Sequence, residues 1–470
     1  MKTKAAVTAA LILGLFSFHL PRAVGQGSLT PPGAPAPTMK TLDQLEARTP
    51  IDPTQPGFTL PYTISTRGSY YLTANLAVTA GNAIVISASN VTLDLNGFTI
   101  SSSASPAGGI AISPGPSLTD IAILNGHIAG SFQHGIRYAG ALGVLKNVRV
   151  EGVSVSGCSG DGINLGNFSS IVIDRCTVQQ AGVQGIVGGS VNNSVAESCG
   201  STGITAKSAT NSVGSCSGSE RGIFAKTAVN CVGESATGTG LDADSATGCW
   251  GQSTAVNSTG TGLNAATATG CYGYNSNGSG IGLRATSANG CYGFGNQGTG
   301  LNATTASGCY GYNSGGGGSG INALSVSNSY GYATNLGTGA SPGIAADTVI
   351  GCYGYNASFG SGIGAKSVTG SYGYSATNGS GIRADTASNC SGYSQNGIGL
   401  EICVAVSFSY GRGGSNGIFM CGLSSIALGC YGVSATGPGI SGCYIANSCV
   451  GQGGPGQQKV IANFKYNMPP

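Results

Sequence analysis

Residues 262–275 read GLNAATATGCYGYN, and residues 300–313 read GLNATTASGCYGYN, so the same sequence pattern occurs twice with few differences. Each copy places apolar or small residues at offsets 0, 2, 5, 8 and 10 from its leucine. Steps of two are typical of β-strands and steps of three mark bends between strands, whereas an α-helix has a period of about 3.6. The pattern therefore predicts a repeat built from short strands.

The same pattern extends over most of the chain. A Gly followed by Ile or Leu serves as an anchor that recurs eighteen times, from Ile84, where Ala83 replaces the glycine, to Ile440. The anchors are 26–27 residues apart at first, then 23, and then mostly 18–20. One unit cannot bury its own apolar face, but stacked units can, because each side chain then lies over its equivalent in the next coil, about 4.8 Å away. We predict an all-β fold, a parallel β-helix (β-solenoid) of about eighteen coils.

The composition excludes other classes. Only 7% of the residues are charged, against about 25% in typical domains. Glycine occurs 84 times without a Gly-X-Y period, which excludes collagen. Mean hydropathy is +0.15 and the net charge is +3, which does not fit a disordered chain. This near-neutral balance gives no reason to expect nucleic acid or an anionic membrane as a partner.

The N-terminus has the features of an export signal, with two early lysines, an apolar run and a small-residue cleavage site. We predict a signal peptide at 1–25, a Pro-rich linker at 26–57 with a short helix around 41–48, the β-helix at 58–459 and a C-terminal cap or tail at 460–470. The mature protein is expected to be secreted or to lie in the cell envelope, in the periplasm or at the surface. No membrane insertion is expected after the signal is removed.

The first coils contain longer runs in which apolar and polar residues alternate, and several of these segments resemble those of a known superfamily. The relevant segments are APTMKTLDQLEARTPI (36–51), GSYYLTANL (68–76), ASNVTLDLNGFTIS (88–101), KNVRVEGVSVSG (146–157), SGDGINL (159–165) and SSIVIDRCTVQQ (169–180). They resemble the right-handed parallel β-helix, pectin-lyase-like superfamily, and among its members the exported bacterial β-helix proteins of unassigned activity. The resemblance implies a right-handed coil, which the periodicity alone does not show.

Two lanes of aromatic residues are predicted on the outside of the coils. Alternate residues of Cys-Tyr-Gly-Tyr face opposite sides of a strand. We align the Cys/Ser and Gly positions with Ile171 and Ile173 of an earlier coil, which we interpret as core, so the tyrosines point outward. The first lane, at offset nine, is Trp250, Tyr272, Tyr292, Tyr310, Tyr330, Tyr353 and Tyr372. The second lane, at offset eleven, is Tyr274, Phe294, Tyr312, Tyr332, Tyr355, Tyr374 and Tyr393.

These lanes have more than one interpretation. Outward rings could stack on one another and cover backbone edges, which is a purely structural role. They could also form a recognition surface, because a phenol offers a flat apolar face and a hydroxyl to a sugar ring, and contiguous exposed aromatic residues mark binding sites. The remaining alternative is that the alternation is reversed and the rings fill the core.

Sixteen cysteines in an exported protein first suggest disulfides. Seven of them share one inward offset: Cys231, Cys249, Cys271, Cys291, Cys309, Cys352 and Cys390. Stacked equivalents lie about 4.8 Å apart, beyond the roughly 3.8 Å between Cβ atoms in a disulfide. Serine replaces cysteine at Ser329 and Ser371, so we interpret the column as small buried hydrophobic residues. The less regular Cys403, Cys421, Cys430, Cys443 and Cys449 could pair.

A cation site can be assembled by analogy with the superfamily. Pectate lyases of this superfamily hold Ca²⁺ with carboxylates on an outer face and use an arginine to abstract the proton. We assign Glu151, Asp174 and Glu197 to equivalent outward positions in three successive coils, with Arg149 and Arg175 beside them. Stacked carboxylates repel one another unless a cation lies between them, and oxygen ligands suit Ca²⁺. The alternative is that all five are solvated exterior residues. No other cofactor is expected.

A second polar pair is predicted at a turn. His134 and Asp161 have equivalent offsets in neighbouring coils, close enough for a hydrogen bond, which would serve either an acid–base step or simply the turn. The N-T-D, D-D, G-H-G and R-I-K motifs of polygalacturonases are absent from the sequence, so paired carboxylates for glycoside hydrolysis are not identified.

The favoured hypothesis is a non-catalytic β-solenoid whose acidic and aromatic lane binds a polysaccharide or a cell-surface glycan. One alternative is a Ca²⁺-dependent polysaccharide lyase centred on Glu151, Asp174 and Glu197. Another is a purely structural surface protein or adhesin. Whether the protein is an enzyme is left open at this point.

Overall fold

The computed structural model describes residues 47–103, 108–113, 117–140, 144–256, 259–276, 278–334 and 341–467. The predicted signal peptide lies outside these ranges, as do residues 26–46 and with them most of the predicted short helix. Every regular element in the described ranges is a β-strand. A helix long and apolar enough to cross a membrane is not found among these residues.

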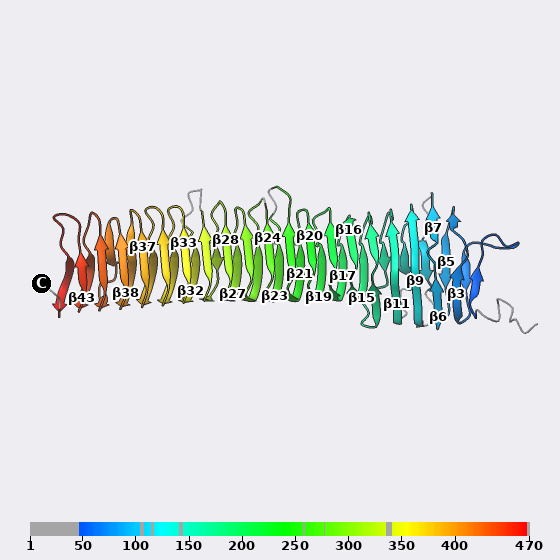
Figure 1. Ribbon diagram of the computed structural model, residues 1–470, viewed down its shortest axis with the longest axis horizontal. Helices are drawn as coiled ribbons and strands as arrows, with labels where there is room; N and C mark the ends of the chain where they lie inside the picture. The colour runs from blue at the N-terminus through cyan, green and yellow to red at the C-terminus, as the bar shows by residue number, and fades with distance from the viewer. Residues whose placement is uncertain are drawn as a thin grey trace, which may run out of the picture. The chain divides into compact units, whose positions relative to one another are not determined.

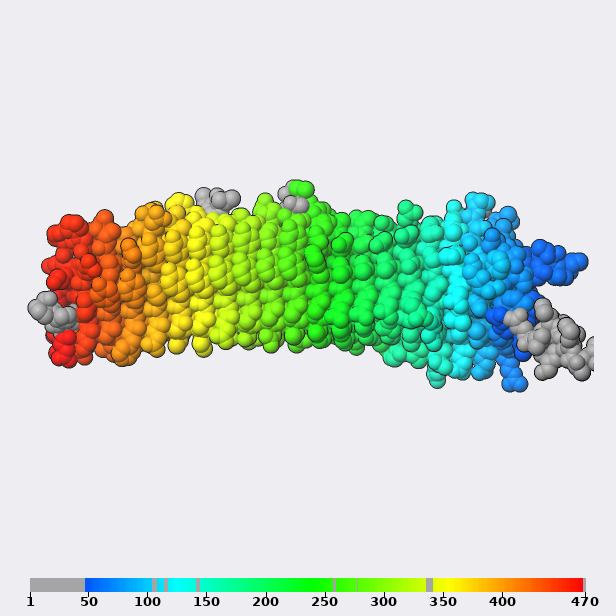
Figure 2. Space-filling view, viewed as in Figure 1, coloured from blue at the N-terminus to red at the C-terminus, as the bar shows by residue number. Residues whose placement is uncertain are grey.

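The unit from Thr49 onward is one ladder of parallel strands, in which each strand pairs with its equivalent in the next coil. Successive coils follow in chain order (Figures 1 and 2). The first coils contain β1 (Thr49–Ile51), β2 (Tyr62–Ile64), β3 (Gly68–Leu72), β4 (Leu76–Val78), β5 (Asn82–Ile86), β6 (Val91–Asp94), β7 (Thr99–Ser102), β8 (Gly108–Ile112), β9 (Thr119–Gly130), β10 (Ile136–Tyr138), β11 (Lys146–Ser156), β12 (Ile163–Asn164), β13 (Ile171–Asp174) and β14 (Thr177–Gln179).

Later coils are more regular and have two strand-bearing sides. The anchor side contains β15 (Ile186–Asn192), β17 (Ile204–Thr210), β19 (Ile223–Val229), β21 (Leu241–Thr247), β23 (Leu263–Thr269), β25 (Leu283–Asn289), β27 (Leu301–Ser307), β29 (Ile321–Asn322), β30 (Ser325–Ser327), β32 (Ile344–Ile350), β34 (Ile363–Thr369), β36 (Ile382–Ser388), β38 (Ile398–Ser407), β40 (Asn416–Met420), β41 (Ile426–Leu428), β43 (Ile440–Asn447) and β45 (Val460–Tyr466). The aromatic side contains β16 (Val195–Cys199), β18 (Val213–Cys216), β20 (Val232–Ser235), β22 (Trp250–Ser253), β24 (Tyr272–Asn275), β26 (Tyr292–Gly295), β28 (Tyr310–Asn313), β31 (Tyr330–Ala333), β33 (Tyr353–Asn356), β35 (Tyr372–Ser375), β37 (Ser391–Ser394), β39 (Tyr410–Gly413), β42 (Tyr431–Ser434) and β44 (Val450–Gln452).

The predicted anchors form one unbroken inward column. All eighteen, from Ile84 to Ile440, pair in register from coil to coil, and each is 0% exposed. Tyr62 precedes them in register and Val460 follows. Eighteen anchors and one residue at each end make about twenty coils. The prediction of a parallel β-solenoid is confirmed.

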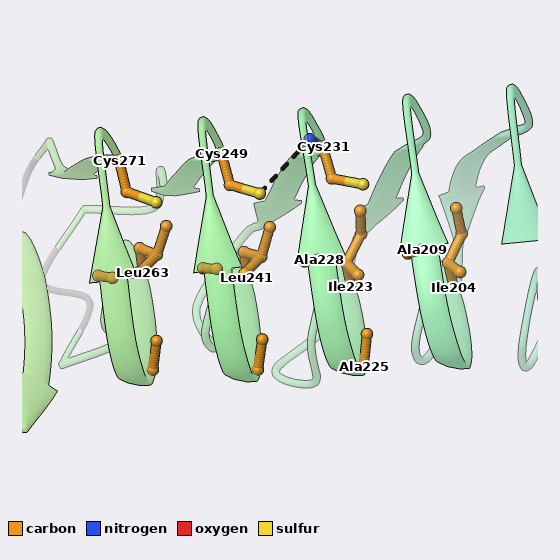
Figure 3. Packing of buried hydrophobic residues seen from close by; sticks show 14 of the residues in the cluster. Ile204, Ala209, Ile223, Ala225, Ala228, Cys231, Leu241, Cys249, Leu263 and Cys271 are labelled. Carbon is orange, nitrogen blue, oxygen red and sulfur yellow. Dashed lines mark hydrogen bonds between the residues drawn. The ribbon is translucent and has the colours of Figure 1, made fainter. Parts of the chain in front are cut away.

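The corner between the two sides explains why cysteine and serine alternate in one column. The residue before each column member has a positive φ, which is 59° at Gly290 and 48° at Asn328, a conformation that glycine and asparagine tolerate best. The column side chain then donates to the carbonyl two residues earlier, as Cys291 does at 3.3 Å and Ser329 at 2.7 Å. It also accepts the amide of its equivalent one coil earlier, as in Cys231 N–H to Cys249 Sγ at 3.5 Å (Figure 3). These residues are therefore hydrogen-bonding groups as well as buried apolar ones.

Another inward column becomes steadily smaller along the chain. Its members, in register, are Leu76, Ile100, Ile128, Val155, Val178, Ala196, Gly214, Gly233, Gly251, Gly273, Gly293 and Gly311. At the glycine end no side chain fits, because a Cβ on Gly311 would lie 2.1 Å from the carbonyl oxygen of Gly320. The early coils enclose aliphatic side chains at this position. In the later coils the interior is so narrow here that the two backbone segments pack directly on each other.

Two equivalences assigned from the sequence are wrong. Asp174 is in register with Glu151 and Asn192, whereas Glu197 is in register with Gln179 on the other side of the coil. In the same coil, Ile171 and Ile173 do not match the Cys/Ser and Gly columns. Those positions belong to Cys176 and Val178.

The cause of both errors is a change in coil length. Strands β12 and β13 are separated by residues 165–170, but in the next coil the single strand β15 pairs with both. Asp174 is eleven residues after its anchor and its partner Asn192 is six after its own, so counting from the anchor shifts by five. The predicted outward direction of the tyrosines is nevertheless correct, because both runs alternate and both begin with a buried residue.

One disulfide links neighbouring coils, between Cys403 and Cys421, whose Cα atoms are 4.7 Å apart. This confirms that cysteines of the less regular C-terminal group can pair. The remaining fourteen cysteines, all of them in the described ranges, are buried thiols. The argument that stacking distance alone prevents a disulfide is wrong, since this pair follows the stacked pair Ile402 and Met420. The cysteines of the inward column differ from Cys403 and Cys421 in their hydrogen bonds at the corner, and not in the spacing between coils.

Candidate functional site

The two predicted lanes are outward stacks of rings. In the strand β24 and its equivalents, the tyrosines are half-buried and the glycine between them is buried, so the alternative of rings in the core is wrong. Ring centroids in the first lane are 4.6 to 5.1 Å apart, and four of its consecutive pairs, from Tyr272 to Tyr353, are within 4° of parallel. Second-lane centroids are 4.5 to 5.4 Å apart. Parallel, in-register strands impose this spacing on identical side chains.

Burial of the stacked rings raises the pKa of several phenols. Burial raises the pKa of Tyr292 and of Tyr330 to about 12, and neighbouring tyrosines of the lanes add to the effect. The pKa values of Tyr310, Tyr353 and Tyr372 are raised for the same first cause, desolvation. The first lane is therefore a neutral surface with hydroxyl groups that can both donate and accept hydrogen bonds.

A groove of about 920 Å³ follows the first lane. It passes over seven coils, from the corner at Gly308 to the corner at Gly429, with the lane residues from Tyr310 to Tyr431 along it. The corner residues are mostly glycine, whose missing side chains leave the space beside the rings open. Lys, Arg, His, Asp and Glu are all absent from the residues that line the groove.

Sequence reasoning missed the far end of this groove. Tyr410 and Tyr431 are in register with the first lane, and Phe408 occupies a corner position there. The signal was present, because both tyrosines lie in a Cys/Ser-Tyr-Gly triplet like those of the lane. It was hidden by changes in the count from the anchor: a register shift between β36 and β38 moves Tyr410 from offset nine to offset ten, and Tyr431 is thirteen residues after its anchor Ile418.

The predicted cation site is only partly assembled. Glu151 and Asp174 are stacked as expected. Glu151 pairs with the guanidinium groups of both Arg149 and Arg175, and Arg175 Nε lies 3.7 Å from Asp174 Oδ2. The repulsion between the two carboxylates is thus relieved by arginine. Glu197 lies on the other side of the coil, and the described residues contain no group of three His, Cys, Asp or Glu side chains that could hold a metal ion.

His134 and Asp161 meet, but in an arrangement that serves the turn. The Asp161 amide donates to His134 Nδ1 at 3.1 Å, and the Asp161 carboxylate accepts from Asn164 Nδ2 and from the amide of Gln184. Burial lowers the pKa of His134, although Asp161 opposes this, so the ring is neutral and Nδ1 is an acceptor. The carboxylate is therefore held by Asn164 of its own coil and by the Gln184 amide of the next, whereas His134 Nδ1 lies 3.6 Å from Asp161 Oδ2.

Comparisons with known proteins add little beyond the fold. No protein-family model matches the chain, and no curated protein matches it in sequence. Among solved structures, the chain is similar to the A-module of mannuronan C-5 epimerase AlgE6 from Azotobacter vinelandii, at 14% identity. The match covers 86% of this chain and 91% of that chain, with a TM-score of 0.28. A similarity of this size carries no argument about activity.

Proposed function

We propose that the protein binds an uncharged polysaccharide along the first lane and its groove, without catalysing a reaction on it. The observation that carries the proposal is the groove itself, which passes over seven coils and has a phenol ring of the first lane at six of them. Within the stack each ring face is covered by its neighbours, so the lane presents ring edges and phenol hydroxyls, and these hydroxyls can bond to sugar hydroxyls. A site whose rings recur from coil to coil suits a ligand that also repeats.

The uncharged lining supports a neutral polymer over a polyuronate. A carboxylate that enters the groove would lose hydration without meeting a lysine, an arginine or a histidine. The phenols offer no counter-charge either, because a phenol is neutral when protonated and an anion when ionised. The predicted export, if it occurs, would bring this surface to polysaccharides outside the cytoplasm.

The lyase alternative has weaker support. It requires three carboxylates on one face, and Glu197 is in register with Gln179, away from Glu151 and Asp174. The two carboxylates that do meet already pair with Arg149 and Arg175. We therefore propose no calcium-dependent cleavage.

Affinity electrophoresis in gels that contain a neutral polysaccharide tests the proposal, with polygalacturonate gels as the charged comparison. We expect retardation in galactomannan or xyloglucan gels and little in polygalacturonate. The double variant Tyr310→Ala/Tyr353→Ala removes two groove rings and should bind at least about tenfold more weakly.

The matched control is Tyr274→Ala, which removes a second-lane ring outside the groove lining and should bind like the wild type. Equal binding by the double variant, or no retardation of the wild type in any neutral gel, would contradict the proposal.

A further inference from the structure

The first lane is interrupted at one coil inside the groove. Ser391 is in register with Tyr372 on one side and with Tyr410 on the other, so a hydroxymethyl group stands where a ring would complete the stack. The lane is regular up to this point, with Tyr353 and Tyr372 centroids 5.1 Å apart, and it resumes with Tyr410 and Tyr431 at 5.6 Å. The second lane is not interrupted here, since Tyr374 and Tyr393 stack at 5.0 Å.

The gap has the dimension of one ring. Tyr372 and Tyr410 are two coil steps apart, about 9.6 Å along the stack. A ring placed midway would lie about 4.8 Å from each, which is the spacing that the lane uses throughout. The structure thus leaves a slot bounded by two aromatic faces, and the groove includes Tyr372, Ser391 and Tyr410 among its lining residues.

The remaining walls of the slot are polar but uncharged. Asn389 forms the corner of the same coil and contributes a side-chain amide, and Ser391 contributes a hydroxyl. Two aromatic faces with an amide and a hydroxyl at the base are the groups that recognise a neutral sugar ring by packing and hydrogen bonding.

The next corner carries an unusual residue. Phe408 has a φ of 45°, where nearly all other corners of the regular coils have glycine or asparagine, and its side chain is 70% exposed. Its ring lies over Gly429 of the following coil, because a Cβ there would be 3.0 Å from Phe408 Cδ1. A bulky residue in this conformation is strained, and such residues are concentrated at ligand sites. Phe408 narrows the groove just beyond the slot.

We infer that the slot at Ser391 binds a single uncharged sugar ring presented as a branch or a chain end. This inference rests on the proposed function and specifies its ligand. A ring sandwiched between Tyr372 and Tyr410 has its plane across the solenoid axis, like the stacked phenols on either side, whereas a linear chain along the groove would hold its rings parallel to that axis. The slot therefore selects polymers with single-sugar branches, with the main chain lying along the uninterrupted part of the lane.

The test is to fill the slot. Ser391→Tyr completes the first lane with the residue that the neighbouring coils already use, so the fold should be kept and its thermal midpoint should stay equal or rise. Affinity for galactomannan should fall about tenfold, to the level of linear mannan, because the branch loses both ring faces. Ser391→Ala keeps the slot and should bind nearly as the wild type. Val232→Tyr adds a ring to the same lane outside the groove and should leave affinity unchanged.

The outcomes separate this inference from the proposed function. If the wild type binds no neutral polysaccharide, the proposed function fails and the inference fails with it. If the wild type binds galactomannan and linear mannan equally and Ser391→Tyr binds both as well as the wild type, the slot is not a branch site and only the inference fails. Phe408→Gly gives a second readout, since it should weaken galactomannan binding while it raises the thermal midpoint by relieving the strained corner.

Discussion

Coils on the two sides of Ala196 share one register but bury their apolar surface in different places. Before it, the shrinking column contains Ile128, Val155 and Val178, and the coils are 22 to 27 residues long. After it, the same column is glycine from Gly214 onward, and most coils have 18 to 20 residues. The aromatic lanes begin only in these narrower coils. Loss of aliphatic packing inside the coil is thus accompanied by ring stacking on its outside.

This comparison shows how a solenoid can shorten its coil without losing cohesion between coils. Each stacked aromatic pair contributes about 0.5–1.5 kcal/mol beyond the area it buries. Both kinds of contact connect one coil to the next, so replacing core residues by lane residues keeps the stabilisation along the stack. The corners of these short coils mostly have small residues, which leave space beside the rings, and this space is the groove.

The largest effect is expected inside the narrow coils. Gly311→Ala would place a methyl group against the Gly320 carbonyl, and overpacking of this kind should destabilise the surrounding coils by about 3 kcal/mol. Hydrogen exchange of β28 and β31 measures this best, because long repeat arrays do not unfold in a two-state manner. Gly317→Ala is the control, since its Cβ would meet nothing within 4 Å, and a large loss there would contradict the narrow-interior explanation.

A smaller effect should follow when a lane ring is removed. Tyr330→Ala abolishes two stacked pairs, at 4.9 and 4.8 Å, and should cost about 2 kcal/mol by the same exchange measurement. Tyr330→Phe keeps the ring and should cost less than about 0.5 kcal/mol. Val213→Ala, at the equivalent position before the lane begins, should also cost less than Tyr330→Ala. A similar loss for Val213→Ala would mean that the lanes do not compensate for the smaller core.

The corner column should show a loss of about 1 kcal/mol when its hydrogen bond is removed. Cys291→Ala leaves the Asn289 carbonyl without its side-chain donor and should destabilise by that amount. Cys291→Ser should be nearly neutral, because serine already makes the same bond at Ser329. Equal loss for both variants would indicate that apolar packing, and not hydrogen bonding, is what the column supplies.

The last effect appears only in alkali. The phenols of Tyr292 and Tyr330 have a pKa of about 12 when folded and would ionise near 10 when unfolded. Between these values the folded chain binds more protons, so stability falls as the pH rises, and the contribution is complete below about pH 10. Phenolate absorbance should show late-titrating tyrosines that titrate normally in denaturant. The thermal midpoint should fall over the same pH range.

Much of the fold could be predicted from the sequence because the repeat is local. Eighteen anchor positions were found, seventeen by a Gly-Ile or Gly-Leu pair and Ile84 by Ala83-Ile84, and each one is in the inward column. The two additional coils were not predicted, because Tyr62 and Val460 occupy the anchor position without a Gly-Ile or Gly-Leu pair. Counting offsets failed where β12 and β13 merge into β15, since a deletion within a coil changes the count but not the alternation.

The candidate site was harder to predict, because it depends on residues that are absent. The lanes follow from alternation, but the groove arises from missing side chains at the corners and from a missing ring at Ser391. The bonds of the cysteine column depend on the positive-φ corner, which the Gly and Asn letters before each cysteine do signal. The register of Glu197 could not be known without the strand pairing, and the cation site was lost for that reason.

The stacking of Trp250 on Tyr272, at 5.1 Å, gives the molecule an optical property. The chain has a single tryptophan, and it stands at the head of a row of phenols spaced closely enough to pass excitation from one to the next. Light absorbed by the tyrosines of this row can pass by energy transfer to one indole. Excitation of these tyrosines would therefore end in emission from Trp250, and that emission would report ligand binding to the lane without any added label.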